Sequence, residues 1–223
     1  MYICSMITLT EENYIKAIYH LGKHGENMVN TNAIAESLAT KASSVTDMVK
    51  KLADKEYLHY KKYQGVILTE KGNRVAINII RKHRLWEVFL VEKLNFTWDE
   101  VHDIAEHLEH IKSEKLINEL DALLEFPTHD PHGDPIPDKN GKFNKIEKIA
   151  LSQATVGTVY KCIGVEDSTT NFLRYLDSNN IGLGTTIAVL HKEPFDNSVK
   201  IKLNITEMVV SQNVAKNLYL KAL

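Results

Sequence analysis

The sequence Thr40-Lys41-Ala42-Ser43-Ser44-Val45-Thr46-Asp47-Met48-Val49-Lys50-Lys51-Leu52 has the periodicity of an amphipathic helix. Its apolar residues, from Val45 to Leu52, fall on one face, and small hydroxyls and lysines remain on the other. Such side chains near a helix N-terminus suit a DNA major groove, because they can approach base edges and phosphates closely. The residues of this helix that we expect to contact DNA are Lys41, Ser43, Ser44, Thr46, Asp47 and Lys50.

The segments on either side complete a known arrangement. Thr8 and Glu11 form a capping box that opens a helix as far as Leu21, and a second helix is predicted near Thr31–Leu38. After the quoted helix, two extended segments, Leu58–Tyr63 and Val66–Thr69, are joined at Gln64-Gly65. Three helices and a hairpin predict a winged helix-turn-helix. At the wing tip, phosphate contacts are expected from Lys61, Lys62 and Tyr63.

A winged helix can also serve protein contacts alone. The exposed face of the quoted helix is almost free of large apolar residues, which favours DNA as its partner. The charge distribution adds little, because the net charge of the chain is only −2. Its acidic excess lies in the middle third, residues 76–150, with fifteen Asp and Glu against ten Lys and Arg.

Length and composition indicate an ordinary globular protein. A chain of 223 residues exceeds one typical domain, so two or three domains are expected. It has no apolar run of the ~20 residues that a membrane span requires. The first six residues, Met1 to Met6, lack the pattern of a secretory signal, which predicts a cytoplasmic location. Cys4 and Cys162 are far apart and are expected to be reduced.

The middle third carries a candidate metal site. A capping box at Thr97 and Glu100 predicts a helix from Thr97 to about Ile111. On one face, within an arc of roughly 100°, this helix should carry two carboxylates and two imidazoles; they belong to His102, Glu106, Glu109 and His110. The opposite face, toward a core, should hold Ile104, Leu108 and Ile111. Such a face suits either a metal ion or a solvated acidic surface.

Two neighbouring helices bear on this choice. A long helix should run to about Leu94, and its His83 and Glu87, four residues apart, form either a surface pair or part of a second metal site. The helix Ser113–Leu124 carries an apolar stripe suited equally to a dimer interface and to a core. The proline-rich residues 126–137 predict an ordered loop or a domain boundary. Because His129 and His132 in it lack a partner at ligand spacing, they are interpreted as structural.

From Ile146 onward the pattern changes to short strands, with one helix near Thr170–Asn179. The expected strands are Ala154–Cys162, Thr185–His191, Val199–Leu203 and Glu207–Val210, which together predict a small β-barrel. Residues 214–220 are compatible with either a helix or a strand.

Four features, in this order, resemble the diphtheria-toxin-repressor (DtxR/MntR) family of metal-dependent transcriptional repressors. They are the winged helix, His83-Arg84-Leu85-Trp86-Glu87, Val101-His102-x-x-x-Glu106-x-x-Glu109-His110 and Pro131-His132-Gly133-x-Pro135-Ile136-Pro137. Phe172-Leu173-Arg174-Tyr175-Leu176 followed by Gly182-Leu183-Gly184 resembles the SH3-like, FeoA-type domain of the longer members.

The resemblance implies a mainly α-helical fold with small β parts. The implied domains are a DNA-binding winged helix (1–72), a helical dimerisation and metal-binding domain (73–145) and an SH3-like β-barrel (146–223). The implied partners are double-stranded operator DNA, a second copy of the chain and a divalent metal ion, with no membrane. Because the family consists of repressors, the chain is expected not to be an enzyme.

The resemblance also implies two metal sites. The primary site takes Glu106, Glu109 and His110, with Asn13 as the ligand from the first helix; the ancillary site takes His83, Glu87 and His102, and Glu166 is a candidate ligand from the last domain. Where manganese-responsive members carry a bridging carboxylate this chain has Lys16, so a binuclear site is not assumed. Iron-type members carry cysteine at the position of Glu106. A set of oxygen and imidazole ligands without thiolate favours Mn²⁺, with Fe²⁺ next.

Two rival functions remain open from the sequence. A di-metal enzyme would need a Glu-x-x-His motif from each of two helices, but the one instance of this spacing here, Glu56-x-x-His59, lies at the start of the wing. A metal-independent winged-helix regulator or interaction module with a vestigial site is kept open by Asn13 and Lys16.

Overall fold

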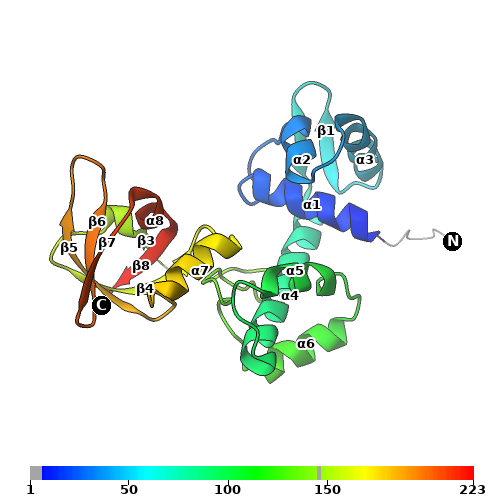
Figure 1. The fold of residues 1–223 in the computed structure, drawn as a ribbon. Coiled ribbons are helices and arrows are strands. Elements are labelled where there is room, and N and C mark those ends of the chain that lie inside the picture. Colours follow the sequence, from blue (N-terminus) through cyan, green and yellow to red (C-terminus); the bar gives the residue numbers. More distant parts are fainter. Residues whose placement is uncertain (1–6, 145–146) are drawn as a thin grey trace. The chain divides into compact units, whose positions relative to one another are not determined.

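The computed structural model describes residues 7–144 and 147–223. The chain divides into two compact units (Figure 1). Unit 1 extends to His83 and includes Glu106–Glu114 and Pro137–Lys142, and unit 2 comprises Arg84–Ala105, Lys115–Ile136 and Phe143–Leu223. The expected domain boundary at 145/146 lies outside the described residues. So do Cys4 and the first six residues, in which the sequence shows no secretory-signal pattern. Within the described ranges, no helix is long and apolar enough to cross a membrane.

Unit 1 contains the predicted winged helix. Its elements are α1 (Leu9–Leu21), α2 (Thr31–Ser37), α3 (Ala42–Asp54), β1 (Leu58–Lys61), β2 (Gly65–Leu68) and the first half of α4 (Glu70–Leu94). The capping box is present: the Thr8 hydroxyl accepts from the Glu11 N–H, and the Glu11 carboxylate accepts from the Thr8 N–H. The strands β1 and β2 pair antiparallel, as a wing requires.

The core of unit 1 forms where α1, α2 and α3 meet the wing. Val45, Val49 and Leu52 of α3 are fully buried, as their spacing predicts, and Met48 is half-buried. They share the core with Ile15 of α1 and other apolar side chains of α1, α2 and β2. The wing is tied to the loop before α2 by backbone hydrogen bonds between Val29 and Val66. Gly65 permits this contact, since a Cβ there would lie 2.4 Å from the Val29 carbonyl oxygen and its φ is +119°.

The helix that carries the candidate metal face is shorter than predicted. α5 spans Val101–Leu108, so Thr97–Glu100 form a preceding turn, and Glu109 and His110 lie in the turn after the helix. The Glu100 carboxylate does accept from the Thr97 N–H, but this interaction closes a turn rather than a helix. At the other end, the Ile111 N–H donates to the Leu108 carbonyl, three residues back, which ends the α-helical ladder.

The prediction of the buried face of α5 was also wrong. Ile104, Leu108 and Ile111 are only half-buried, whereas Val101 and Ala105 are fully buried. Glu109, four residues after Ala105, is fully buried as well. A carboxylate therefore continues the buried stripe, and such a group is stable there only when cations or hydrogen-bond donors surround it.

Unit 2 contains α6 (Glu114–Leu123) from Lys115 onward, the proline-rich loop and the C-terminal barrel. The core interpretation of the α6 stripe holds for Ile117, Leu120 and Leu124, which are buried, whereas Leu116 and Leu123 are 40% and 59% exposed. The proline-rich loop is ordered, with an antiparallel bridge between His129 and Pro135.

The C-terminal part forms a six-stranded antiparallel sheet in the order β3-β8-β4-β5-β6-β7. The elements are β3 (Ile149–Ala150), the 3₁₀ turn η1 (Leu151–Gln153), β4 (Val159–Val165), α7 (Thr170–Ser178), β5 (Thr186–Lys192), β6 (Val199–Leu203), β7 (Thr206–Val210), α8 (Gln212–Asn217) and β8 (Leu218–Ala222). The first predicted strand starts five residues later than expected, because residues 154–158 form a bend and a turn instead of extended chain. Residues 214–220 divide between α8 and β8. The mainly α-helical fold with an SH3-like C-terminal part is confirmed.

Candidate metal centre

The first cluster of candidate ligands lies in unit 1, where α1 meets the end of α5 and the turn after it. The Nδ1 atom of His110 lies 2.6 Å from Oε2 of Glu12, and both side chains are almost fully buried. Nε2 of the same ring faces Oε1 of Glu109 at 3.8 Å. A carboxylate that accepts from one imidazole nitrogen orients the ring and leaves the other nitrogen available as a metal ligand.

Two buried oxygens in this unit support cation binding. Oε1 of Glu109 has no hydrogen-bond partner within the part of the chain that the structure describes. The same is true of Oδ1 of Asn13, one residue after Glu12 on α1. A buried oxygen without a donor costs free energy, and a bound cation would offset that cost. The donor set of Asn13, Glu106, Glu109 and His110 is hard and lacks thiolate, so it fits a divalent cation such as Mn²⁺ or Fe²⁺.

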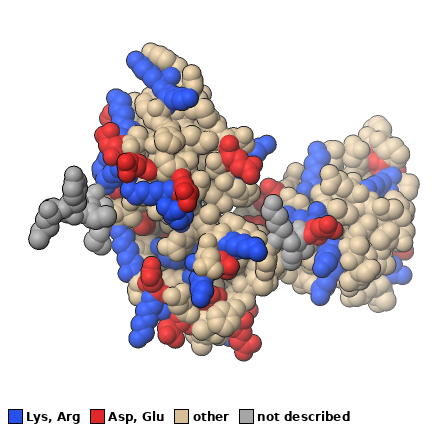
Figure 2. All heavy atoms as spheres, turned by 180° about the vertical axis from the view of Figure 1, so that it is seen from behind, with Lys and Arg blue, Asp and Glu red and all other residues tan. Residues whose placement is uncertain are grey.

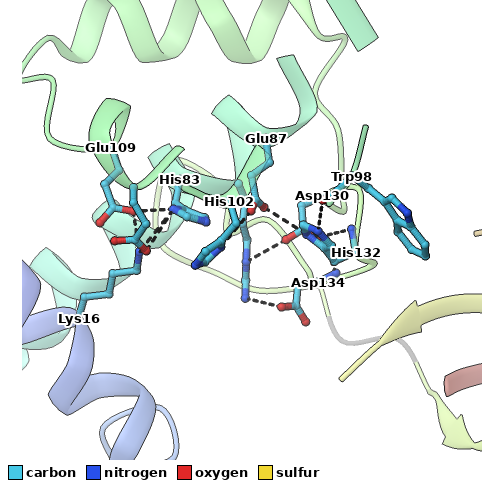
Figure 3. Close-up of polar contacts among 11 residues, drawn as sticks. Lys16, His83, Glu87, Trp98, His102, Glu109, Asp130, His132 and Asp134 are labelled. Carbon is cyan, nitrogen blue, oxygen red and sulfur yellow. Dashed lines mark hydrogen bonds and ion pairs between the residues drawn. The ribbon is translucent and has the colours of Figure 1, made fainter. Parts of the chain in front are cut away.

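Lys16 lies on α1 one turn after Asn13 and contacts the same carboxylates (Figure 3). Its Nζ atom forms an ion pair with Glu106 and lies 2.6 Å from Oε2 of Glu109. It also lies 3.4 Å from Nδ1 of His83, which is itself 2.6 Å from Oε2 of Glu109. The ammonium is thus surrounded by two carboxylates and an imidazole, and one of these carboxylates is fully buried.

The second cluster lies in unit 2. It contains the predicted ligand Glu87 together with Asp130 and His132, which the sequence did not predict as ligands. Glu87 of α4 lies 3.5 Å from Nδ1 of His102 and 3.6 Å from Nδ1 of His132. Glu87, Asp130 and His132 each offer a ligand atom within 4.8 Å of the others, and all three are buried (Figure 3). His132, interpreted from the sequence as structural, is therefore a candidate ligand together with Asp130.

The electrostatics of this cluster are dominated by burial. Burial by itself would lower the pKa of His132, but the hydrogen bond and charge of Glu87, with the charge of Asp130, raise that pKa to about 9. Burial raises the pKa of Asp130, and the Glu87 carboxylate raises it further while Arg84 opposes the rise. A divalent cation here would satisfy two carboxylates that otherwise depend on an imidazolium and a guanidinium.

Trp98, before α5, positions the His132 ring. Its ring stacks on that of His132 with the centroids 6.2 Å apart, and its carbonyl oxygen lies 2.8 Å from His132 Nε2. The Trp98 indole N–H donates to Asp177 of α7 at 2.9 Å, and Arg174 of α7 donates to Asp99 at 2.8 Å. Helix α7 of the barrel therefore contacts the segment that supports the second cluster.

The two remaining predicted ligands are His83 and Glu166. His83 lies in unit 1 with Glu106 and Glu109, so its assignment to a site with Glu87 and His102 stays a prediction. Glu166 is exposed and accepts a hydrogen bond from the Tyr219 hydroxyl. Burial and this carboxylate raise the pKa of Tyr219 to about 12.

The residues predicted to contact DNA lie on the surface of unit 1. Of the α3 set, all are exposed except Thr46, which is half-buried and whose hydroxyl donates to the Ala42 carbonyl. At the wing tip, Lys61 and Lys62 are exposed and Tyr63 is 91% exposed. In Figure 2, seen from behind, lysine and arginine side chains lie at the top, where Figure 1 places the hairpin.

A DNA-binding winged helix, a cluster of buried carboxylates and imidazoles, and a small C-terminal barrel together define a class of protein, the metal-responsive transcriptional regulators. Three family models match this chain in the same order. They describe the N-terminal DNA-binding domain of iron-dependent repressors (residues 6–66), their metal-binding and dimerisation domain (69–138) and the FeoA domain (149–222). The chain belongs to the DtxR/MntR family of metal-dependent transcriptional repressors.

Individual relatives agree with this assignment. The chain is 36% identical to the HTH-type transcriptional regulator MntR of Bacillus subtilis over 121 residues, which cover 54% of this chain and 84% of MntR. It is 37% identical to the iron-dependent repressor IdeR of Mycobacterium tuberculosis over 128 residues, covering 57% of this chain and 55% of IdeR. The match thus spans about half the length of IdeR.

Solved structures extend the likeness over nearly the whole chain. A manganese-dependent transcriptional repressor in complex with manganese superposes with a TM-score of 0.83 at 31% identity, covering 96% of this chain and all of the other. The repressor ScaR with bound Cd²⁺ superposes with a TM-score of 0.77 at 34% identity, covering 96% and 99%. The family and these relatives are transcriptional repressors and not enzymes, which argues against a di-metal enzyme.

Proposed function

We propose that this chain is a homodimeric repressor that binds operator DNA when Mn²⁺ or Fe²⁺ occupies the first cluster. The observation that carries the proposal is the buried Oε1 of Glu109, which has no hydrogen-bond partner among the described residues and faces an imidazole that Glu12 already orients; Oδ1 of Asn13, next to Glu12 in α1, is likewise buried without such a partner. Relatives named for both iron and manganese support the choice of metals. Since these relatives regulate transcription, the proposed location is the cytoplasm.

The bound cation would supply positive charge and tie α1 to the turn after α5. Asn13 of α1 and Glu109 with His110 of the turn would hold it, and Glu106 would complete the set. Ile15 and Ile18 of α1 belong to the core that supports α3, so a change in the position of α1 reaches the proposed DNA-contacting helix. By linkage, operator DNA must raise the affinity for metal by the same factor as metal raises the affinity for DNA.

The proposal includes a symmetric dimer, because two winged helices are needed to read two half-sites. The exposed apolar side chains Leu116 and Leu123 of α6, with Phe126, support a dimer surface; their exposed fractions are 40%, 59% and 67%. Leu123→Glu should shift the chain from dimer to monomer in sedimentation equilibrium. A Leu123→Glu chain that stays dimeric would place the dimer surface elsewhere.

We further propose that the second cluster, Glu87, Asp130 and His132, holds another divalent cation, supported by the mutual distances and complete burial of its ligand groups. The ancillary ligand His102 contacts Glu87 and belongs to the same proposal. The proposed domain boundaries are 1–72, 73–145 and 146–223.

The deciding experiment measures DNA binding with and without metal. A duplex is first selected from a random pool by the manganese-loaded chain, and its affinity is then measured by fluorescence anisotropy with Mn²⁺ or with chelator. We expect binding to weaken strongly in chelator and in Glu106→Ala. The matched control is Asp103→Ala, an exposed carboxylate on the same helix, which should bind as wild type does.

A metal-independent regulator is the second candidate, because Lys16 already forms ion pairs with Glu106 and Glu109 without a metal. Equal DNA affinity in Mn²⁺ and in chelator would establish this alternative and reject the co-repressor mechanism. Equal affinities for wild type and Glu106→Ala under metal would instead reject the ligand assignment.

A further inference from the structure

We propose that the Lys16 ammonium is a built-in second cation of the metal centre: it permanently fills a second cation position, so the first cluster takes one divalent ion and not a coupled pair. This inference rests on the proposed metal site and deepens it, since it specifies the stoichiometry of that site and a residue that sets it.

The surroundings of the Lys16 Nζ atom are those of a cation site. Three groups converge on it: Oε1 of Glu106, Oε2 of Glu109 at 2.6 Å and Nδ1 of His83 at 3.4 Å (Figure 3). Two carboxylates from α5 and the turn after it, with an imidazole from α4, are ligands of the kind that a hard divalent ion prefers. The Lys16 side chain is only 13% exposed, so water does not take the place of these partners.

The two oxygens of Glu109 have different roles in this arrangement. Oε2 contacts both Lys16 and His83, whereas Oε1 has no hydrogen-bond partner among the described residues and faces Nε2 of His110. One carboxylate thus serves a position that the ammonium fills and a position that remains open to a metal ion. Glu109 would bridge the two cations as the carboxylates of two-metal sites do.

Charge balance gives the same stoichiometry. The side chains in direct contact include three carboxylates, those of Glu12, Glu106 and Glu109. Among the groups in direct contact, one divalent ion and the Lys16 ammonium balance these three carboxylates. The buried ammonium of Lys82, whose charge also acts on Glu12 and Glu109, adds positive charge nearby, so two divalent ions would leave a still larger excess of positive charge in a buried site. Such an excess is unfavourable because buried charge must be paired.

The ammonium also competes with the metal ion for the same oxygens. A tethered cation reaches these carboxylates at no translational cost, so a free metal ion must bind against its charge. The resulting affinity for metal is lower than the ligand set alone would provide. A site of this kind would respond only at raised metal concentrations.

The test compares manganese binding by full-length wild type, Lys16→Glu and Lys16→Met. Lys16→Glu replaces the ammonium with an oxygen ligand, and we expect about one additional Mn²⁺ per chain, with the exchange-coupled electron paramagnetic resonance signal of a manganese pair. Lys16→Met removes the charge and keeps an unbranched side chain, and we expect its single Mn²⁺ to bind at least about tenfold more tightly. Counting the difference from wild type cancels any ion at the second cluster.

The matched control is Lys55→Met, because Lys55 also pairs with a fully buried carboxylate, that of Glu11, at 2.7 Å. Its manganese affinity and count should equal those of wild type. Equal manganese counts in wild type and Lys16→Glu, or a Lys16→Met chain that binds Mn²⁺ no more tightly than wild type, would overturn the inference. If Lys16→Glu fails to fold, Lys16→Met decides.

These outcomes are separate from those of the proposed function. Metal-dependent DNA binding by wild type with no additional ion in Lys16→Glu would reject the role of Lys16 alone. An additional coupled ion in Lys16→Glu, together with DNA binding that ignores metal, would support the role of Lys16 and reject the co-repressor function.

Discussion

The hydrogen bond between Glu12 and His110 provides a sharp test of the first cluster. Both side chains are buried, and the 2.6 Å distance between Oε2 and Nδ1 is that of a strong, charge-assisted hydrogen bond. Its proposed role is to hold the Nδ1 proton, so that Nε2 points its lone pair at the metal position. Glu12 itself would not touch the metal ion.

Replacing Glu12 should therefore weaken metal binding without removing a ligand. Loss of such a supporting partner typically lowers metal affinity by about 10- to 100-fold, or about 1.4 to 2.7 kcal/mol. Glu12→Gln keeps an oxygen acceptor of the same length and loses the charge, so the lower end of this range is expected. Glu12→Ala loses both and should approach the upper end.

The assay is the Mn²⁺ dissociation constant, measured from the signal of free Mn²⁺ in electron paramagnetic resonance. Glu36→Gln, at an exposed position of α2, is the matched control and should leave the constant unchanged. Far-UV circular dichroism checks that each variant is folded. If folded Glu12→Ala binds Mn²⁺ within twofold of wild type, then Glu12 does not orient a ligating imidazole, and the ligand assignment of the first cluster is wrong.

Three further predictions concern stability and DNA. Burial would raise the pKa of Glu11, but Lys55 and other partners lower that pKa from 4.5 to about 2. The carboxylate therefore stabilises the fold by about 3 kcal/mol above pH 4.5, and this contribution is lost as the pH falls toward 2. Urea unfolding of Glu11→Gln should show a smaller acid dependence of stability than wild type. His132→Ala leaves two buried carboxylates, those of Glu87 and Asp130, without their imidazolium. It should lower the free energy of unfolding of the metal-free chain, measured in urea, by about 3 kcal/mol. His129→Ala, at a half-buried position, should lower it far less. Lys61→Ala should weaken binding to specific and non-specific duplexes alike and flatten the salt dependence of binding, and loss of specific binding alone would remove Lys61 from the phosphate contacts.

The winged helix was predictable because its signals are local. The capping box at Thr8, the apolar periodicity of α3 and the hairpin each act within a few residues, and the structure confirms them. The hairpin turn itself lies at residues 62–64 rather than at Gln64-Gly65, because Gly65 already belongs to β2 and pairs with Lys61. The end of α5 was not predictable in this way. The helical arc that placed Glu109 and His110 on α5 holds only if the helix continues, and the tertiary contacts of Glu109 with Lys16 and His83 belong to residues far away in sequence.

The same limit explains which site residues were missed. Glu12 has the sequence signature of an acidic residue in the first turn of a helix, and its contact with His110 spans 98 positions. Asp130 and His132 lie in a proline-rich loop without helical or strand periodicity, so no spacing rule relates them to Glu87. One local signal was available for them: the Asp130 carboxylate accepts from the N–H groups of His132 and Asp134, and an Asp-Pro-His-Gly turn favours such bonds.

Helix α1 can link metal binding to DNA binding because it presents two chemically different faces. Glu12, Asn13 and Lys16 belong to the charged centre, whereas Ile15 and Ile18 are fully buried in the core that also contains Val45 and Val49 of α3. Close packing resists independent motion of the two helices, so a shift of α1 must be shared by α3 or must open the core. The number and position of positive charges beside α1 therefore bear directly on the orientation of α3. A tethered ammonium and a metal ion differ in this respect: the ammonium moves with α1, and only the metal ion can be removed by the cell.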